Sequence, residues 1–178
     1  MVDVPKYRDL LEAIKKAYRD MDSGRYRIKD LALVAVLVFT GCRLGEALAL
    51  TKADIDTKER VVRIKQSKKR RESYRVVPVP SGLFWEIMDR YLWRVEDLLF
   101  DISERQSRNI VYKFSMRYLK KKIRPHAIRH SYALAVLEAT KNIEIVRRLL
   151  GHSNYNTIKY YLDYTQKDLE EELSNIFS

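Results

Sequence analysis

A histidine and an arginine at helical spacing could work together on a phosphate. In RPHAIRHSY, His126 and Arg129 lie three residues apart, which places them on one helix face, and Pro125 suits the first turn of that helix. The pair sets a titratable imidazole beside a fixed guanidinium, although a surface histidine and arginine would show the same spacing. His130 shares this face, but its apolar neighbours indicate a structural role.

A second arginine follows a glycine that should end a helix. In TGCRLGEALAL, Gly41 ends an apolar helix, Arg43 lies in the first turn of the next one, and Glu46 follows one turn later. A guanidinium beside helix-terminal amides is well placed to bind an oxyanion. A structural Arg–Glu pair explains the spacing equally well.

The segment LLGHSNYNTIKYYLDYT holds a histidine, His152, and four tyrosines within ten positions. Tyrosine can pack in a core, stack on a base or attack an electrophile. Tyr160 and Tyr161 point about 100° apart on a helix, so they cannot both face one phosphate. Tyr155 lies near the expected helix start and fits a packing or capping-region role. Tyr164, one turn after Tyr160 and Tyr161, fits packing or a contact with the DNA backbone.

Several common catalytic motifs are absent from the sequence. It has no GxxxxGK[ST] loop, no paired cysteine clusters, no HExxH and no evident carboxylate set for magnesium. A protein of this kind that acts on a phosphodiester must supply its own cations and nucleophile, so we expect no metal and no cofactor. A zinc site is the weaker alternative; its ligands would be Cys42, His126, His130 and His152.

Composition points to one domain with a polyanionic partner. The chain has 178 residues, 46% of them apolar, and a net charge of +11. Residues 58–75 hold nine Lys or Arg against two acids, and residues 113–129 hold seven against none. We expect both segments to face nucleic acid, although any single lysine is more simply a solvated side chain.

Periodicity predicts a mainly α fold with a small antiparallel β-sheet (α+β). Helices are expected from Tyr7 to Met21, from Ile28 to Gly41 and from Arg43 to Leu50. β-branched runs at Val61–Lys65 and Ser73–Val79 predict a hairpin with a basic tip. Further helices are expected near residues 82–95, 106–119, 125–139, 143–150, 155–164 and 167–176.

A cytoplasmic location is expected from what the chain lacks. Cys42 is the only cysteine, and no secretory leader opens the chain. The longest apolar run, Leu31 to Phe39, is about half the length that spans a bilayer, so no membrane partner is expected. A charged fraction of one third, with few Asn and Gln, favours a heat-tolerant source.

In order and approximate spacing, these motifs resemble the catalytic domain of tyrosine recombinases, the phage integrase and Xer family. The resemblance rests on Thr40–Glu46, the basic hairpin, His126–Arg129, and Leu149–His152 followed nine residues later by Tyr161. It spans about residues 7–165. It implies a single catalytic domain over residues 1–178, with residues 166–178 as a C-terminal tail helix, in a fold that acts on double-stranded DNA.

The resemblance also implies a strand transfer without metal or ATP, through a 3′-phosphotyrosyl bond. Tyr161 would attack the DNA phosphate while Arg43 and Arg129 hold its non-bridging oxygens. His126 would assist proton transfer and His152 would donate a hydrogen bond to the phosphate. The remaining implied role is that of Glu46, which would buttress the arginines and His126.

A hairpin lysine supplies the leaving-group proton in the family. Lys68 aligns best, with Lys65 and Lys69 as alternatives. The distance from His152 selects Tyr161, which leaves Tyr160 for the core and Tyr164 as the fallback nucleophile. The basic residues expected to bind DNA are Lys65, Lys69, Arg70, Arg71, Lys120, Lys121 and Lys122.

Two rival functions fit parts of the pattern: a non-catalytic basic DNA-binding module, and strand relaxation like that of a type IB topoisomerase. The family usually carries a core-binding domain ahead of the catalytic one, whereas this pattern begins almost at the first residue, so we expect weak, salt-sensitive DNA binding. The tail places Leu169, Leu173 and Ile176 or Phe177 on one stripe. It would pack either on its own domain or on a neighbour within a synaptic tetramer.

Overall fold

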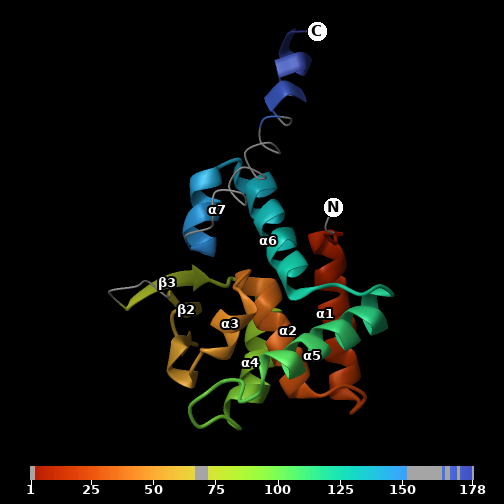
Figure 1. The fold of residues 1–178 in the computed structure, drawn as a ribbon, viewed down its shortest axis with the longest axis vertical. Helices are drawn as coiled ribbons and strands as arrows, with labels where there is room; N and C mark the ends of the chain where they lie inside the picture. Colours follow the sequence, from red (N-terminus) through yellow and green to blue (C-terminus); the bar gives the residue numbers. More distant parts are fainter. Residues whose placement is uncertain (1–2, 67–71, 152–165, 167–168, 172, 178) are drawn as a thin grey trace.

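A computed structural model describes residues 3–66, 72–151, 166, 169–171 and 173–177 (Figure 1). Its α-helices are α1 (Tyr7–Asp22), α2 (Ile28–Thr40), α3 (Leu44–Leu48), α4 (Gly82–Leu92), α5 (Glu104–Leu119), α6 (Pro125–Thr140) and α7 (Ile143–Leu150). Its strands are β1 (Ile55–Asp56), β2 (Val61–Gln66) and β3 (Ser73–Pro78), with a 3-10 turn, η1 (Lys52–Asp54), before β1. The expected fold class, mainly α with a small antiparallel sheet, is confirmed.

Helix α2 is the centre of the core. Every residue from Leu31 to Val38 is at most 1% exposed, because this run is apolar on all faces of the helix. Helices α1, α4, α5 and α6 pack around it (Figure 1). α1 contributes only a stripe, Leu10, Ala13, Ile14 and Ala17, as its amphipathic pattern predicts. The core thus supports the C-terminal end of α2, where the candidate site begins.

The end of α2 requires a glycine for two reasons. Gly41 has φ +65°, in the left-handed region that side chains rarely adopt. A Cβ at this position would also collide with the Tyr132 ring from α6. This sharp turn lets the chain enter α3 at Leu44, later and for fewer residues than the expected Arg43 to Leu50.

The three strands form an antiparallel sheet in the order β1, β2, β3. Val62 pairs with Val77 and Ile64 with Arg75, and all four side chains are buried on the same side. β1 has only two residues, too few to show a period, and was not expected. β2 packs on α3, and β3 packs on α7. The sheet therefore lies next to the two helices that adjoin the C-terminal end of α2.

Helices α6 and α7 enclose a second, smaller core. Tyr132, Leu137, Val146 and Leu150 are buried against one another. Asn142 starts α7 by accepting hydrogen bonds from the amides of Glu144 and Ile145. This packing fixes the C-terminal end of α7 beside the turn at the end of α2.

The described part of the tail is helical, and in Figure 1 it projects away from the body. Its apolar side chains Leu169, Leu173, Ile176 and Phe177 are exposed, the last two by 73% and 81%. Packing on its own domain therefore does not cover this stripe. The helix expected at 155–164 lies outside the described residues. Among the described helices, none is long and apolar enough to cross a membrane.

Candidate active site

Arg43 is presented by the short connection between α2 and α3. It is the residue just before α3, with extended backbone angles (φ −70°, ψ 153°), rather than a member of the first turn. Its amide donates a 2.8 Å hydrogen bond to Glu46 Oε1, which fixes the start of the helix. Its side chain remains 45% exposed, so the guanidinium is accessible to a ligand.

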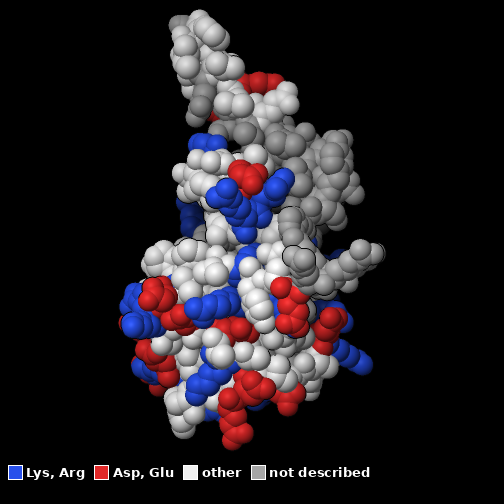
Figure 2. All heavy atoms as spheres, turned by 90° about the vertical axis from the view of Figure 1, so that its left-hand side faces the viewer, with Lys and Arg blue, Asp and Glu red and all other residues white. Residues whose placement is uncertain are grey.

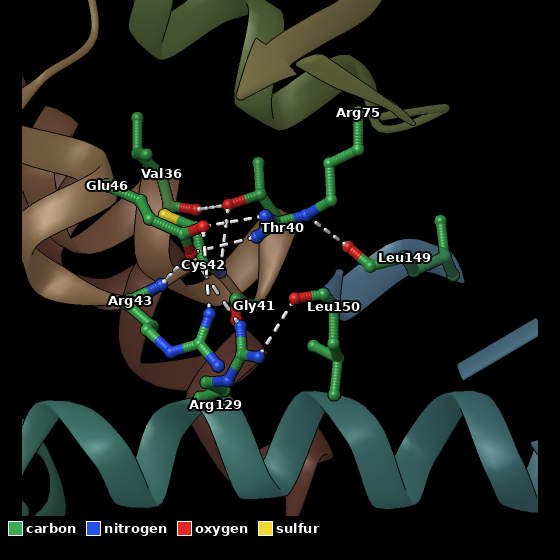
Figure 3. Close-up of polar contacts among 10 residues, drawn as sticks. All are labelled: Val36, Thr40, Gly41, Cys42, Arg43, Glu46, Arg75, Arg129, Leu149 and Leu150. Carbon is green, nitrogen blue, oxygen red and sulfur yellow. Dashed lines mark hydrogen bonds and ion pairs between the residues drawn. The ribbon is translucent and has the colours of Figure 1, made fainter. Parts of the chain in front are cut away.

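Glu46 lies among three arginines (Figure 3). Its carboxylate accepts hydrogen bonds of 2.6 Å and 2.9 Å from Arg75 Nη1 and Nη2, and it forms ion pairs of 3.8 Å with Nη1 of Arg43 and of Arg129. Burial opposes the charge of Glu46, but the bonds from Arg75, the Arg43 amide and the charge of Arg129 outweigh it. Together they hold the pKa of the carboxyl below its usual range. The expected buttressing of His126 by Glu46 stays a prediction.

Arg129 is a buried cation on α6, only 2% exposed. Its Nη1 donates to the carbonyl of Gly41 and its Nη2 to the carbonyl of Leu150, each at 2.9 Å (Figure 3). Both carbonyls belong to helix ends, where backbone acceptors lack partners within the helix. Arg129 therefore joins α2, α6 and α7 at one point.

His126 lies one turn before Arg129 on α6 and is exposed, whereas His130 is half-buried. Their rings meet edge to face, with centroids 4.5 Å apart. Burial, followed by the charges of Arg129 and Arg43, lowers the pKa of His126 below 6.5. Burial, His126 and Arg129 lower the pKa of His130 likewise. At neutral pH His126 is thus a neutral imidazole that can accept a proton.

A cavity of about 630 Å³ brings these groups together. It is lined by Cys42, Arg43, Leu44, Arg108, Tyr112, Lys122, Arg124, Pro125, His126 and Arg129. Of these described lining residues, half are arginine or lysine and none is acidic. Such a cavity attracts an anion and offers it several charged donors. Sequence reasoning had not selected Arg108, Tyr112 or Arg124 as functional residues.

Arg75 is a further charged residue, beside the cavity and buried, that sequence reasoning missed. It sits on β3 in the same inward phase as Val77, and its Nε donates a 2.8 Å hydrogen bond to the carbonyl of Leu149. The signal was available in SYRVVPV, because a strand period of two places Arg75 on the buried side with Val77 and Val79. An arginine at an inward position requires buried partners.

The expected DNA-binding lysines that the structure describes differ in their surroundings. Lys65 Nζ donates a 2.7 Å hydrogen bond to Glu72, and this bond raises the pKa of Lys65, which makes its ammonium a poorer proton donor. Lys120 bonds the carbonyl of Arg117 and Lys121 pairs with Asp3. Lys122 alone of these lysines lines the cavity; its Nζ lies 4.3 Å from the centre of the Tyr112 ring.

The surface toward the hairpin side is mixed in sign. Figure 2 shows Lys and Arg interspersed with Asp and Glu over the lower body in this view. The cavity, whose described lining holds no acidic residue, therefore distinguishes the site more clearly than surface charge on this face does.

Several expected site residues lie outside the described residues. They are Lys68, Lys69, Arg70 and Arg71 in the hairpin and His152 and Tyr161 after α7; the fallback Tyr164 lies there as well. Their roles stay predictions.

The zinc alternative has little support within the described residues. There, no group of three or more His, Cys, Asp or Glu could hold a metal ion. Cys42 is buried, and burial raises the pKa of its thiol to about 11, which disfavours the thiolate that zinc requires. His152, the fourth ligand of that alternative, is outside the described residues.

The chain is similar to known proteins in sequence and in fold. The phage integrase family profile matches residues 4–168, and the chain belongs to this family. A tyrosine recombinase of Pseudothermotoga lettingae is 29% identical over 157 residues, which are 83% of this chain and 54% of the relative. Tyrosine recombinase XerA of Pyrococcus furiosus is 31% identical over 155 residues, 82% of this chain and 54% of the relative. The chain thus spans about half the length of these curated relatives.

Solved structures confirm the fold. The crystal structure of XerA recombinase superposes with a TM-score of 0.74 at 23% identity, covering 97% of this chain and 65% of the other. XerH site-specific recombinase, bound to palindromic difH substrate in a post-cleavage complex, gives a TM-score of 0.78 at 22% identity and covers 98% and 53%. The resemblance to tyrosine recombinase catalytic domains is confirmed.

Proposed function

We propose that this chain is the catalytic domain of a site-specific DNA recombinase or integrase. The observation that carries the proposal is the cavity in which Arg43, Arg129 and His126 meet, with no acidic residue in its described lining. Two guanidiniums of fixed charge suit the oxygens of a phosphate, and an imidazole kept neutral by its surroundings suits the removal of a proton. Family membership supports the same reading, since the relatives are tyrosine recombinases.

In the proposed reaction, Tyr161 is the nucleophile. Its hydroxyl proton passes to His126, its oxygen forms a bond to the scissile phosphorus, and the bond from phosphorus to the 5′ oxygen breaks. Lys68 gives that leaving oxygen a proton. One phosphodiester is exchanged for one phosphotyrosyl ester, so the step needs no ATP, and a 5′-hydroxyl of another strand reverses it.

The charge that gathers on phosphorus in the transition state is met by fixed donors. Arg43 and Arg129 bind the non-bridging oxygens, and His152 donates a further hydrogen bond. Removing one preorganised donor of this kind typically lowers the rate by about 10²- to 10³-fold. Glu46 keeps the arginines oriented through the contacts described above.

Around the scissile phosphate, Arg108, Lys122 and Arg124 line the same cavity and bind neighbouring phosphates of double-stranded DNA. The exposed apolar tail supports self-association into a synaptic tetramer on DNA, since such a stripe favours a partner surface. Deleting residues 166–178 should then reduce association on DNA, measured by crosslinking, while leaving strand cleavage intact.

A covalent-capture experiment tests the proposed function. The protein is incubated at low salt with nicked duplexes of randomised sequence, with and without EDTA, and denaturant-resistant adducts are recovered and sequenced. Adducts that form in EDTA and share a sequence support the proposal. Binding without any adduct would indicate the DNA-binding module instead. Relaxation of supercoiled DNA without exchange between two recovered sites would indicate topoisomerase-like activity.

A further inference from the structure

Arg75 stands at the centre of the charged network but does not reach the surface. Its side chain is 5% exposed. Its described hydrogen bonds all go to partly buried protein groups: the carboxylate of Glu46 and the carbonyl of Leu149. A charge leaves water only where protein groups replace its hydration. Arg75 therefore acts on its neighbours rather than on a bound phosphate.

The three arginines around Glu46 do not share it equally. Arg75 donates hydrogen bonds of 2.6 Å and 2.9 Å to the two carboxylate oxygens of Glu46. This bidentate geometry is the strongest arrangement for an arginine and a carboxylate. Nη1 of Arg43 and of Arg129 each stand 3.8 Å from the same carboxylate. Arg75 thus fixes the orientation of Glu46, and Glu46 in turn holds the other two guanidiniums nearby without tying either in a short hydrogen bond to itself.

Arg75 also fixes the end of α7. Its Nε donates to the carbonyl of Leu149, one residue before the Leu150 carbonyl that Arg129 binds. Gly151 follows with φ +78°, and a Cβ there would lie 2.9 Å from Arg75 Nη1. The chain therefore leaves α7 closely packed against the Arg75 guanidinium, and the next residue in the sequence is His152.

The same residue anchors the hairpin. Arg75 pairs with Ile64 in the register of β2 and β3, and β3 begins at Ser73, two residues earlier. The loop that contains Lys68 joins these two strands. One buried guanidinium thus connects the base of the hairpin, Glu46 and the end of α7.

We propose that Arg75 is a positioning residue of the strand-transfer site. It holds the phosphate-binding arginines, through Glu46, in register with the two segments from which His152 and Lys68 follow. The proposal rests on the proposed function, because the reaction it serves is the transfer of a DNA strand.

The test compares Arg75→Met and Arg75→Lys with wild type in single-turnover cleavage at saturating DNA. Because Arg75 is buried, DNA affinity should stay within about threefold, whereas the cleavage rate of Arg75→Met should fall about 10²-fold or more, with Arg75→Lys between the two. Arg90→Gln is the matched control. Arg90 lies on α4, outside the cavity, and pairs with Asp22, so this variant should cleave DNA like wild type. An Arg75→Met rate within threefold of wild type overturns the proposal.

The pH profile separates positioning from a general loss of structure. Without Arg75, Glu46 loses the bonds that favour its charged form, so the carboxylate protonates at higher pH than in wild type. The rate deficit of Arg75→Met should therefore grow as the pH falls. A deficit that stays constant across the folded pH range contradicts the role assigned to Glu46 and overturns the proposal.

Two further measurements keep the test decisive. If Arg75→Met does not fold, Arg75→Met with Glu46→Leu replaces the buried ion pair by apolar groups; it should fold yet cleave slowly. Inorganic phosphate, titrated against the His126 ring signals in NMR, probes the cavity without catalysis. Weaker phosphate binding in Arg75→Lys than in wild type supports the positioning role. Failure of wild type to form a DNA adduct would count against the proposed function alone and would leave this result standing. Unchanged phosphate binding overturns the positioning role.

Discussion

The Leu150 carbonyl, at the end of α7, accepts a 2.9 Å hydrogen bond from Nη2 of Arg129 on α6. The same guanidinium binds the carbonyl of Gly41 at the end of α2 through Nη1. The guanidinium of arginine carries its N–H donors in a fixed planar geometry, so this one side chain reaches both carbonyls. The residue proposed to bind phosphate is thus also a structural link between three helices.

Arg129 and Arg43 should therefore respond differently to replacement by lysine. Arg129→Lys leaves a buried carbonyl without its donor and should lower the free energy of unfolding by about 2 kcal/mol. Arg43 is 45% exposed, so Arg43→Lys should change stability by less than about 0.5 kcal/mol. Both should lower the cleavage rate about 10²-fold.

Urea unfolding and single-turnover cleavage measure the two effects side by side. Equal losses of stability in the two variants would contradict the structural role given to Arg129. Full cleavage by either variant would remove that arginine from the phosphate site.

Acid should destabilise the fold through His126 and His130. Their folded-state pKa values are lowered from 6.5, so below that pH the unfolded chain binds protons more readily than the folded one. The free energy of unfolding should keep its full value above pH 6.5 and should decrease as the pH falls through and below 6.5. Denaturant unfolding across this range measures it, and the double variant His126→Gln, His130→Gln should flatten the decline. An unchanged slope in that variant would assign the effect to other groups.

Single charges around the cavity should tune DNA affinity and its salt dependence. Lys122→Ala and Arg124→Ala each remove a cation from the cavity lining, so each should reduce the slope of log affinity against log salt by about 1. Lys16→Ala on the exposed face of α1 removes an equal charge outside the cavity and serves as the control. Fluorescence anisotropy over a salt series gives the slopes. Equal slopes for all three variants would mean that only net charge matters.

Glycine replacements should separate backbone strain from packing. Gly24 and Gly41 both have positive φ, so alanine at either should cost about 1 kcal/mol of stability. At Gly41 the new Cβ also meets the Tyr132 ring, whereas at Gly24 nothing lies within 4 Å. Gly41→Ala should therefore lose at least about 2 kcal/mol more than Gly24→Ala in urea unfolding. Similar losses would show that Tyr132 moves aside at little cost.

Local patterns predicted much of this fold because local physics determines it. The apolar run in α2 and the stripe on α1 fix two helices, and Gly41 marks the turn between α2 and α3. α3 begins one residue later than expected because Arg43 is extended, and it ends at Leu48 rather than Leu50. β1 was missed because two residues carry no period.

The site could be predicted only in part. Arg43, His126 and Arg129 were selected by type and spacing, and the structure brings all three to one cavity. The burial of Arg129 and its bond to Leu150 depend on contacts between distant segments, which no local pattern encodes. The inward position of Arg75 on β3 could have been predicted from the strand period. Its pairing with Glu46 could not, because Glu46 lies 29 residues away in the sequence.

A covalent adduct with DNA would show whether Tyr161 attacks the phosphate, as proposed above. Wild type, Tyr161→Phe and Tyr112→Phe are each incubated with nicked duplex DNA that carries the recovered site. Tyr112 lines the cavity and is the matched control for an accessible tyrosine. We expect a denaturant-resistant adduct with wild type and Tyr112→Phe, mapped by mass spectrometry to Tyr161, and none with Tyr161→Phe. An adduct that persists in Tyr161→Phe would rule out Tyr161 as the nucleophile.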